Sequence, residues 1–215
     1  MLRSRLSRHL LLGTIAVSTT GGLYAAVPHD SPVVAATDAS AYSALAFLSV
    51  ALLIGPALVL RGRRPPRHVE WRRDIGIWAG ILSLFHVLAG TNVHFAGDWV
   101  RYFLTRAEEG ARVPIRVDAF GIANHLGLFA TIVVVLLLVI SNNAAMRKMG
   151  GVRWKAAQRA TYALFILTGA HGVLYQVLSE RRIEGVILLW LALVTVTLAQ
   201  VAGFRRVRVG RADTE

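Results

Sequence analysis

Six long apolar runs constrain the fold of this chain more than any other feature. A helix that crosses the hydrocarbon layer of a bilayer, roughly 30 Å thick, needs about 20 apolar residues. Runs of this length lie near residues 10–27, 41–60, 74–95, 120–141, 158–179 and 184–204. Transmembrane strands would instead alternate apolar and polar residues over segments of about ten. We therefore predict an all-α integral membrane protein in which residues 1–215 form one domain, a bundle of six transmembrane helices.

The basic residues predict how this bundle is oriented. The chain has 24 Lys and Arg residues and a formal net charge of +12, and 18 of those 24 lie in alternate gaps between the apolar runs. By the positive-inside rule these gaps are cytoplasmic, which places both the N and the C terminus inside. The positive charge is thus expected to orient the protein in a bacterial-type inner membrane and to contact anionic lipid. Nucleic-acid binding is not expected.

The first run, residues 1–27, has two interpretations. The stretch "RSRLSRHLLLGTIAV" followed by small residues resembles a signal peptide. The apolar run continues through "STTGGLYAAV", however, and no clean Ala-x-Ala pair precedes "PHDSP", which favours a retained helix. Cleavage stays open as the alternative, and it would leave the topology of the later helices unchanged.

Several chemistries are excluded by what the sequence lacks. There is no cysteine, so disulfides, thiolate-ligated iron–sulfur clusters and covalently attached c-type haem are ruled out. No Gly-rich dinucleotide fingerprint follows a strand, and about eleven residues follow the last apolar run, too few for a flavin or nicotinamide domain. A soluble electron donor would therefore be a separate protein.

Histidines are the remaining side chains that could bind a metal or a cofactor. Of the seven histidines, His9, His29 and His68 fall in or beside polar flanks, where solvated surface rings are expected. The other four lie in or at the ends of the apolar runs, and they are His86, His94, His125 and His171. Ionisable residues inside a bilayer are costly and usually face a protein interior or a functional site. A single such histidine is nevertheless more often a packing residue than a metal ligand.

Two of these histidines are predicted to lie at the same depth. At about 1.5 Å per residue, His86 lies about 18 Å from Asp74, and His171 lies about 19.5 Å from Gln158. The third and fifth helices run in the same direction, so the two rings are level. Two neutral imidazoles at one height are the axial ligands that a low-spin haem iron needs. We therefore interpret His86 and His171 as the metal ligands of a b-type haem.

Small residues surround both rings. Gly90 follows His86 at helical spacing, and His171 lies in "TGAHG" between Gly169 and Gly172. Small side chains leave room for a porphyrin, so these three glycines are candidates for the haem pocket. They are equally typical of close packing between membrane helices, and both roles stay open.

The other two intramembrane histidines are poorer ligand candidates. His125, about six residues from the outer end of the fourth helix, is a candidate for contact with a haem propionate or a quinone, with plain helix packing as the alternative. His94 lies eight residues beyond His86, about 12 Å further out on an ideal helix and rotated by roughly 80°. With Asn92 and Asp98 it could form an outer entry for an acceptor or quinone, or a polar cluster without chemistry.

Two segments resemble a known family. The segment "RRDIGIWAGILSLFH" resembles the third helix of the ferric-reductase-like transmembrane domain, and "SNNAAMRKMGGVRWKAAQRATYALFILTGAH" resembles the connection from the fourth to the fifth helix. The particular resemblance is to the haem-binding membrane subunit of the bacterial periplasmic methionine sulfoxide reductase system. It implies that His86 and His171 are transmembrane haem ligands, and that Arg153 and Trp154 form a cytoplasmic turn.

One position departs from this family. Where the subunit has a further histidine, thirteen residues before the last, this chain has Gln158. Glutamine is a weak iron ligand, so one haem b is expected and a second is doubtful. A donor at the inner side would then need a further relay, such as a quinone or a membrane-bound flavin.

These features predict a membrane protein that passes electrons from a quinol or reduced flavin to an acceptor, a protein or a metal, on the outer side. The segment "GDWVRYFLTRAEEGARVPIRVD", with Trp99, Tyr102 and Phe103, is the candidate docking surface; a loop anchored by interfacial aromatic residues is the alternative. The alternative function is a non-redox membrane subunit or small transporter whose histidines serve packing or proton transfer.

Overall fold

The structure is a bundle of helices. The computed structural model describes residues 4–26, 31–62, 67–105, 114–178 and 183–212. In these ranges the one extended pairing is an isolated antiparallel bridge between Leu104 and Ile115. The helices are α1 (Arg5–Ala26), α2 (Pro32–Leu60), α3 (Arg67–Gly90), η1 (Phe95–Gly97), η2 (Trp99–Tyr102), α4 (Ala119–Ile140), α5 (Asn143–Met149), α6 (Gly151–Gln158), α7 (Ala160–Leu178) and α8 (Ile183–Ala212). The prediction of an all-helical protein is confirmed.

Within the described residues, four segments are long and apolar enough to cross a membrane. These segments are Pro32–Leu60, Ala119–Ile140, Gly151–Leu178 and Ile183–Val209. α1 and α3 are long helices as well, but they are not among these segments. α1 contains His9 and several Ser, Thr and Gly residues, and α3 carries Glu70, Arg72, Arg73 and Asp74 near its start. The chain is a multi-pass membrane protein; six spans and cytoplasmic termini stay predictions.

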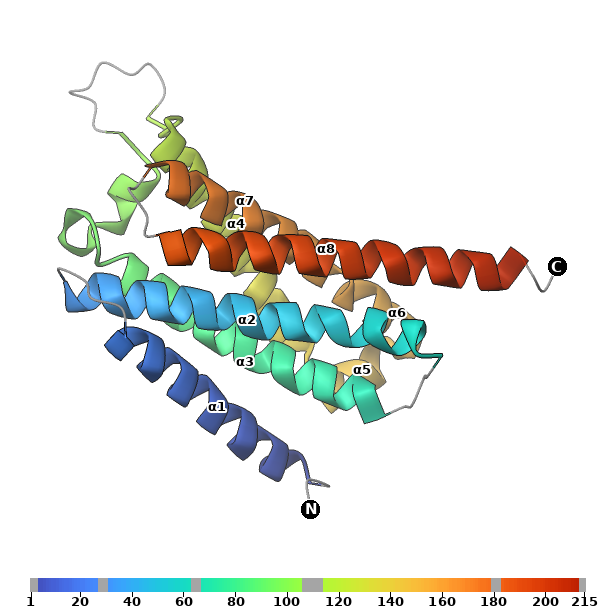
Figure 1. The fold of residues 1–215 in the computed structure, drawn as a ribbon. Helices are drawn as coiled ribbons and strands as arrows, with labels where there is room; N and C mark the ends of the chain where they lie inside the picture. Colours follow the sequence, from blue (N-terminus) through green and yellow to red (C-terminus); the bar gives the residue numbers. More distant parts are fainter. Residues whose placement is uncertain (1–3, 27–30, 63–66, 106–113, 179–182, 213–215) are drawn as a thin grey trace.

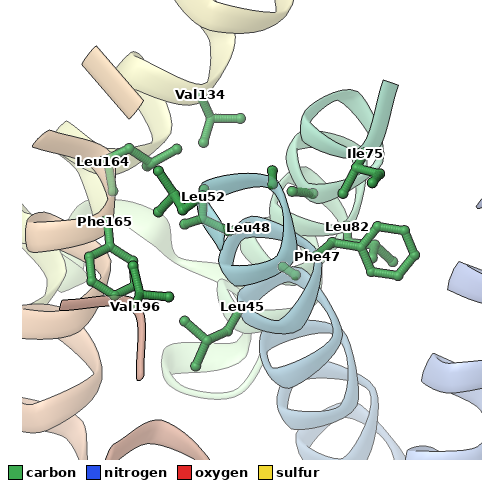
Figure 2. Packing of buried hydrophobic residues seen from close by; sticks show 14 of the residues in the cluster. Leu45, Phe47, Leu48, Leu52, Ile75, Leu82, Val134, Leu164, Phe165 and Val196 are labelled. Carbon is green, nitrogen blue, oxygen red and sulfur yellow. The ribbon is translucent and has the colours of Figure 1, made fainter. Parts of the chain in front are cut away.

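α2 is the central helix of the bundle. It packs against α1, α3 and α8, while α4 packs mainly against α7 (Figure 1). Figure 2 shows apolar side chains radiating from α2 towards its neighbours, with the fully buried Leu52 among them. The partners of this core come from α3 (Ile75 and Leu82), α4 (Val134), α7 (Leu164 and Phe165) and α8 (Val196).

Several helix ends differ from the predicted ones: α3 begins at Arg67 rather than near residue 74, and α8 continues to Ala212 rather than to residue 204. Local hydrogen bonds explain two further differences. α2 begins at Pro32 rather than near residue 41, because Ser31 accepts a hydrogen bond from the Val33 N–H and Pro32 has the φ of a first helical residue. α3 ends at Gly90 rather than near residue 95: the Thr91 hydroxyl and the Asn92 amide both donate to the Leu88 carbonyl. His94 therefore lies in a loop, and its predicted helical position is wrong.

A proline links α2 to α8. Pro56 lies inside α2, and because proline has no N–H, the carbonyl of Leu52 loses its helical donor. The side-chain amide of Gln200 on α8 donates to that carbonyl at 2.8 Å. Gly203, one turn further along α8, allows the close approach, since a Cβ there would lie 3.2 Å from the Pro56 Cα. The missing backbone donor of one helix is thus replaced by a side chain of another.

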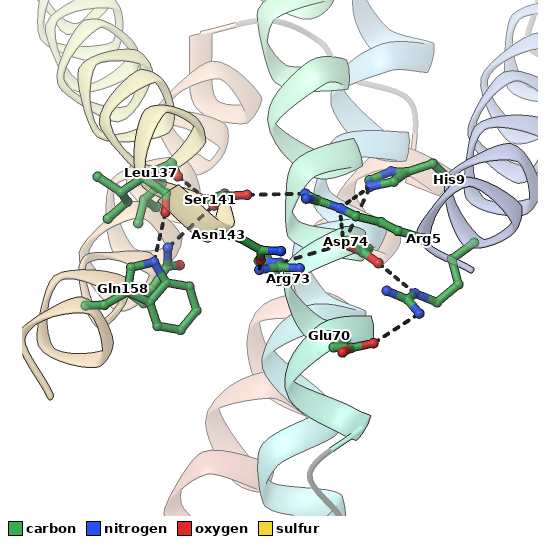
Figure 3. A network of polar contacts seen from close by, with 12 residues as sticks. Arg5, His9, Glu70, Arg73, Asp74, Leu137, Ser141, Asn143 and Gln158 are labelled. Atoms are coloured by element: carbon green, nitrogen blue, oxygen red, sulfur yellow. Dashed lines mark hydrogen bonds and ion pairs between the residues drawn. The ribbon is translucent and has the colours of Figure 1, made fainter. Parts of the chain in front are cut away.

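α1 is held to α3 by a buried ionic cluster. Asp74 on α3 has no exposed surface and accepts a hydrogen bond of 2.8 Å from Nε of Arg8, which is itself 5% exposed (Figure 3). Arg8 also contacts Glu70 at 3.0 Å, and Nε2 of His9 lies 3.5 Å from the Asp74 carboxylate. The prediction that His9 is a solvated surface ring is therefore wrong. His29 and the side chain of His68 lie outside the described residues.

The same cluster reaches the segment that joins α4 to α6. Arg73 donates to the side-chain carbonyl of Asn143 at 2.7 Å, and Arg5 donates to the backbone carbonyl of Ser141 at 3.5 Å (Figure 3). The Gln158 amide donates to the Ser141 hydroxyl at 3.4 Å. Polar contacts thus connect α1, α3, α4 and α6 across this end of the bundle.

Replacing Asp74 with asparagine is expected to lower the free energy of unfolding by about 3–5 kcal/mol, because Arg8 would remain buried without its full counter-charge. SDS-induced unfolding in mixed micelles measures this change, and trypsin should cleave after Arg5 and Arg8 sooner in the variant. The matched control is Asp118→Asn, which keeps the helix cap and removes an exposed ion pair, at a cost of about 1 kcal/mol or less. Equal losses in both variants would contradict a structural role for the cluster.

A double-mutant cycle tests the link between α2 and α8. Gln200→Leu alone is expected to destabilise the protein by about 1–3 kcal/mol, because the Leu52 carbonyl loses its donor. In a Pro56→Ala background the restored backbone N–H serves that carbonyl, so Gln200→Leu should cost clearly less. The same unfolding assay gives the coupling, with Thr197→Leu at an exposed position of α8 as control. Additive effects would show that Gln200 acts independently of the proline.

Candidate cofactor site

A large cavity is lined by three of the four histidines of the apolar runs, His86, His94 and His171. Its volume is about 1060 Å³, and side chains from α2, α3, α4, α6, α7 and α8 line it. At one end, here called the loop end, it reaches Asp38, His94, Tyr102 and Glu184; at the other, the basic end, it reaches four cations and Gln158. The cations are Arg72, Arg73, Lys155 and Arg159. His86 and His171 both line the cavity between these ends.

The two histidine rings approach each other across the cavity. The ring centroids of His86 and His171 are 6.2 Å apart, and the ring planes form an angle of 80°. His86 comes from α3 and His171 from α7, two helices that belong to different packing groups of the bundle. The pair therefore bridges the space between the α2–α3 and the α4–α7 halves.

Each ring forms a hydrogen bond with a backbone carbonyl of a neighbouring helix. Nδ1 of His86 lies 3.0 Å from the Thr37 carbonyl of α2, and Nδ1 of His171 lies 2.8 Å from the Ala123 carbonyl of α4. A carbonyl only accepts hydrogen bonds, so both Nδ1 atoms carry the proton and donate. In a neutral ring the lone pair is then on Nε2. This is the arrangement by which proteins orient a metal-binding imidazole.

Gly127, which lies against the His171 ring, was not among the predicted site residues. A Cβ at Gly127 on α4 would lie 3.0 Å from both Cε1 and Nδ1 of the His171 ring. That is closer than about nine in ten real Cβ contacts, so the His171 ring would have to shift by a few tenths of an ångström to admit a larger residue. The only local feature in the sequence is a small residue one turn after Ala123. It indicates a contact with His171 only when α7 is known to pack on this side of α4.

The three glycines predicted to line a pocket have different surroundings. Gly90 and Gly172 line the cavity. An added Cβ would lie 3.5 Å from Thr37 at Gly90, 3.1 Å from Leu189 at Gly172 and 2.8 Å from Leu193 at Gly169. Gly169 and Gly172 therefore allow α8 to pack closely on α7, which is the packing role that the sequence left open.

His125 and His94 take separate positions. Nδ1 of His125 bonds to the Gly121 carbonyl of its own helix at 2.6 Å, and its ring packs on Phe103 at 5.5 Å. Among the described residues that line the cavity, His125 is absent. His94 lines the loop end, where its ring contacts Phe120 at 5.4 Å. The structure thus brings His94, but not His125, to the cavity.

Tyr102 fixes the loop after α3. It is 3% exposed, and its hydroxyl accepts from the His94 N–H at 2.9 Å and donates towards the Gly90 and His94 carbonyls at 3.0 and 3.1 Å. Burial raises the pKa of the Tyr102 phenol, although the hydrogen bond with the His94 backbone opposes the rise. The phenol therefore stays protonated at neutral pH and ties this loop to the end of α3.

The remaining aromatic residues of the predicted docking segment face in different directions. Trp99 is 64% exposed, whereas Phe103 packs against His125. Residues 106–113 of that segment lie outside the described residues. Only Trp99 among the three aromatic residues is thus placed to meet lipid or a partner.

The chain matches the family described as ferric reductase like transmembrane component over residues 40–169. It belongs to this family. The matched stretch includes His86 and ends just before His171. Membership agrees with the resemblance seen in the third and fifth helices and, together with the apolar helices, supports a multi-pass membrane protein that serves electron transfer.

The chain is similar to three named proteins. The chain is 29% identical to the protein-methionine-sulfoxide reductase heme-binding subunit MsrQ of Rhodospirillum rubrum over 186 residues, which is 86% of this chain and 81% of that protein. It is 29% and 28% identical to the magnetosome protein MamZ of Magnetospirillum gryphiswaldense and Paramagnetospirillum magneticum over 131 residues, 61% of this chain. The match spans only 18% of the length of either MamZ protein.

Proposed function

We propose that this protein is a b-type haem subunit that carries electrons across part of a bacterial inner membrane, with His86 and His171 as the two axial ligands. The observation that carries the proposal is the close pair of imidazoles, each oriented by a carbonyl hydrogen bond. The relative MsrQ, which is a heme-binding subunit by name, covers most of the chain and supports the same cofactor.

The donor set fits a haem better than a bare metal ion. Among the described residues, no group of three or more His, Cys, Asp or Glu side chains could hold a metal. Two imidazoles leave most coordination positions of iron unfilled, and the four nitrogens of a porphyrin supply them. A site with two facing histidines and room around them is therefore suited to a macrocycle that brings its own equatorial ligands.

The spacing of the rings supports this fit. Two metal–nitrogen bonds of about 2 Å each, in line, separate the centroids of two bound imidazoles by roughly 6 Å. The observed separation is 6.2 Å. The cavity volume of about 1060 Å³ exceeds the roughly 300–1,000 Å³ typical of small-ligand pockets.

The chain's own residues would hold, orient and shield the cofactor. The hydrogen bonds to the Thr37 and Ala123 carbonyls would fix the orientation of both rings and raise their basicity as ligands. Apolar side chains such as Leu48, Val134 and Leu164 exclude water from the walls. A haem bound there would supply the one-electron chemistry, and the protein would set its potential by ligation and burial.

One haem is expected. Gln158, which stands where the related subunit has a histidine, donates to the Ser141 hydroxyl at the basic end. The position thirteen residues before His86 is Arg73, whose guanidinium contacts Asn143. Neither side chain is a ligand of the kind that haem iron uses. We infer that a quinol or reduced flavin donates from the cytoplasmic side and that an acceptor, a reductase subunit or a metal, receives electrons outside.

Absorption spectra test the ligand assignment. The protein purified in detergent from haem-replete cells should show b-type bands in reduced-minus-oxidised spectra, with a haem content near one per chain. His86→Ala and His171→Ala should each abolish these bands, whereas His125→Ala, which removes a ring outside the cavity lining, should keep them. A colourless, well-folded wild-type preparation would favour the non-redox alternative, and a haem content near two would refute the argument from Gln158.

Gly127→Ala tests how His171 is seated. The added methyl group should displace the ring from the Ala123 carbonyl, and losses of such supporting contacts cost about 10–100-fold in metal affinity. We expect haem retention during dialysis to fall by about tenfold or more and the electron paramagnetic resonance signal of the ferric form to shift. The control is Gly76→Ala, which adds a methyl group to the cavity wall with nothing within 4 Å. Equal behaviour of the two variants would exclude the proposed seat.

A further inference from the structure

The basic end of the cavity has a charge pattern that the haem proposal does not use. Arg72, Arg73, Lys155 and Arg159 line it, and among the described lining residues both carboxylates, Asp38 and Glu184, lie at the loop end. Arg73 is 9% exposed, and its Nε has no hydrogen bond and lies 3.8 Å from the Asp74 carboxylate. Four cations that line one end of a cavity favour a ligand with negative charge there.

The walls beyond these cations are apolar. Leu137 and Leu138 of α4 and Leu164 of α7 line this half of the cavity, with the buried Trp154 beside them. The Trp154 indole already donates to the Ile140 carbonyl at 2.8 Å. A ligand that fits this half has an anionic head at the mouth and a hydrocarbon body within.

The basic end is remote from the histidine pair. Arg73 precedes His86 by thirteen residues and Arg159 precedes His171 by twelve, so both lie about 18–20 Å from the rings along their helices. This distance separates the four cations from the iron position. The half of the cavity around Gln158, here called the second compartment, is therefore remote from the histidine pair although both line one cavity.

We propose that this compartment binds one acidic phospholipid, with its phosphate among Arg72, Lys155 and Arg159 and an acyl chain along Leu137 and Leu164. The positive-inside prediction puts this end at the cytoplasmic surface, where anionic lipid is abundant, and basic pockets between transmembrane helices bind such headgroups. The lipid would fill the space beside Gln158 and seal the cavity against water. The inference does not depend on a haem at the histidine pair.

The test compares two charge-matched triple variants. In the lining variant, Arg72→Gln, Lys155→Gln and Arg159→Gln remove cations of the cavity wall; in the control, Arg147→Gln, Lys148→Gln and Arg153→Gln remove three exposed cations of α5 and α6 outside it. Native mass spectrometry measures retained phosphatidylglycerol against phosphatidylcholine of the same chain length. We expect the lining variant to bind phosphatidylglycerol about ten- to a hundredfold more weakly and the control to stay within about threefold of the wild type.

Other outcomes would overturn the assignment. Equal loss in both variants would mean that lipid binds by surface charge alone. Tight binding of inorganic phosphate or glycerol 3-phosphate would mean that the site takes free phosphate. If the lining variant lost haem but retained phosphatidylglycerol, the three cations would be assigned to cofactor binding rather than to lipid binding. If the triple lining variant fails to fold, Arg72→Gln against Arg147→Gln makes the same comparison. A colourless protein that retains phosphatidylglycerol would support this site and refute only the haem proposal.

Discussion

The hydrogen bonds from two imidazole Nδ1 atoms to backbone carbonyls are the constraint on which the site depends. A histidine inside a bilayer has no water to satisfy its second nitrogen, so the protein must supply the partner. Thr37 on α2 and Ala123 on α4 supply it, each from a helix next to the one that carries the ring. Because each bond joins two helices, the orientation of the rings and the packing of the bundle are specified together.

The same rule explains the other polar groups in the apolar helices. The Leu52 carbonyl, which has no helical donor because of Pro56, accepts a hydrogen bond from the Gln200 amide. The Asp74 carboxylate accepts a hydrogen bond from the Arg8 guanidinium. In each case the partner lies on a different helix and far away in the sequence. Directional polar contacts of this kind fix which helix lies beside which, whereas apolar packing alone would tolerate several arrangements of similar helices.

The sequence predicted the features that depend on composition and helical spacing. It did not predict the contacts of a side chain whose partner is far away in the sequence. The lengths of the apolar runs identified the long helices, and the count from Asp74 and Gln158 placed His86 and His171 at one level before any contact was known. Ser31 and Pro32 are typical residues for the start of a helix, but the predicted start of α2 followed the apolar run, which begins nine residues later. His9 could not be recognised as a partner of Asp74, and Gly127 could not be recognised as the seat of His171, because both depend on helix pairing.

The two ends of the cavity have opposite chemistry, which limits what can enter from each. Carboxylates and aromatic rings line the loop end, while cations line the basic end. An anionic group is therefore attracted at the basic end and repelled at the loop end, and the apolar stretch between them admits only hydrocarbon or a planar ring system. Glutamine is a weak iron ligand, so Gln158 gives the basic end a neutral polar wall rather than a position suited to binding haem iron. The basic end is then best suited to retaining a charged ligand.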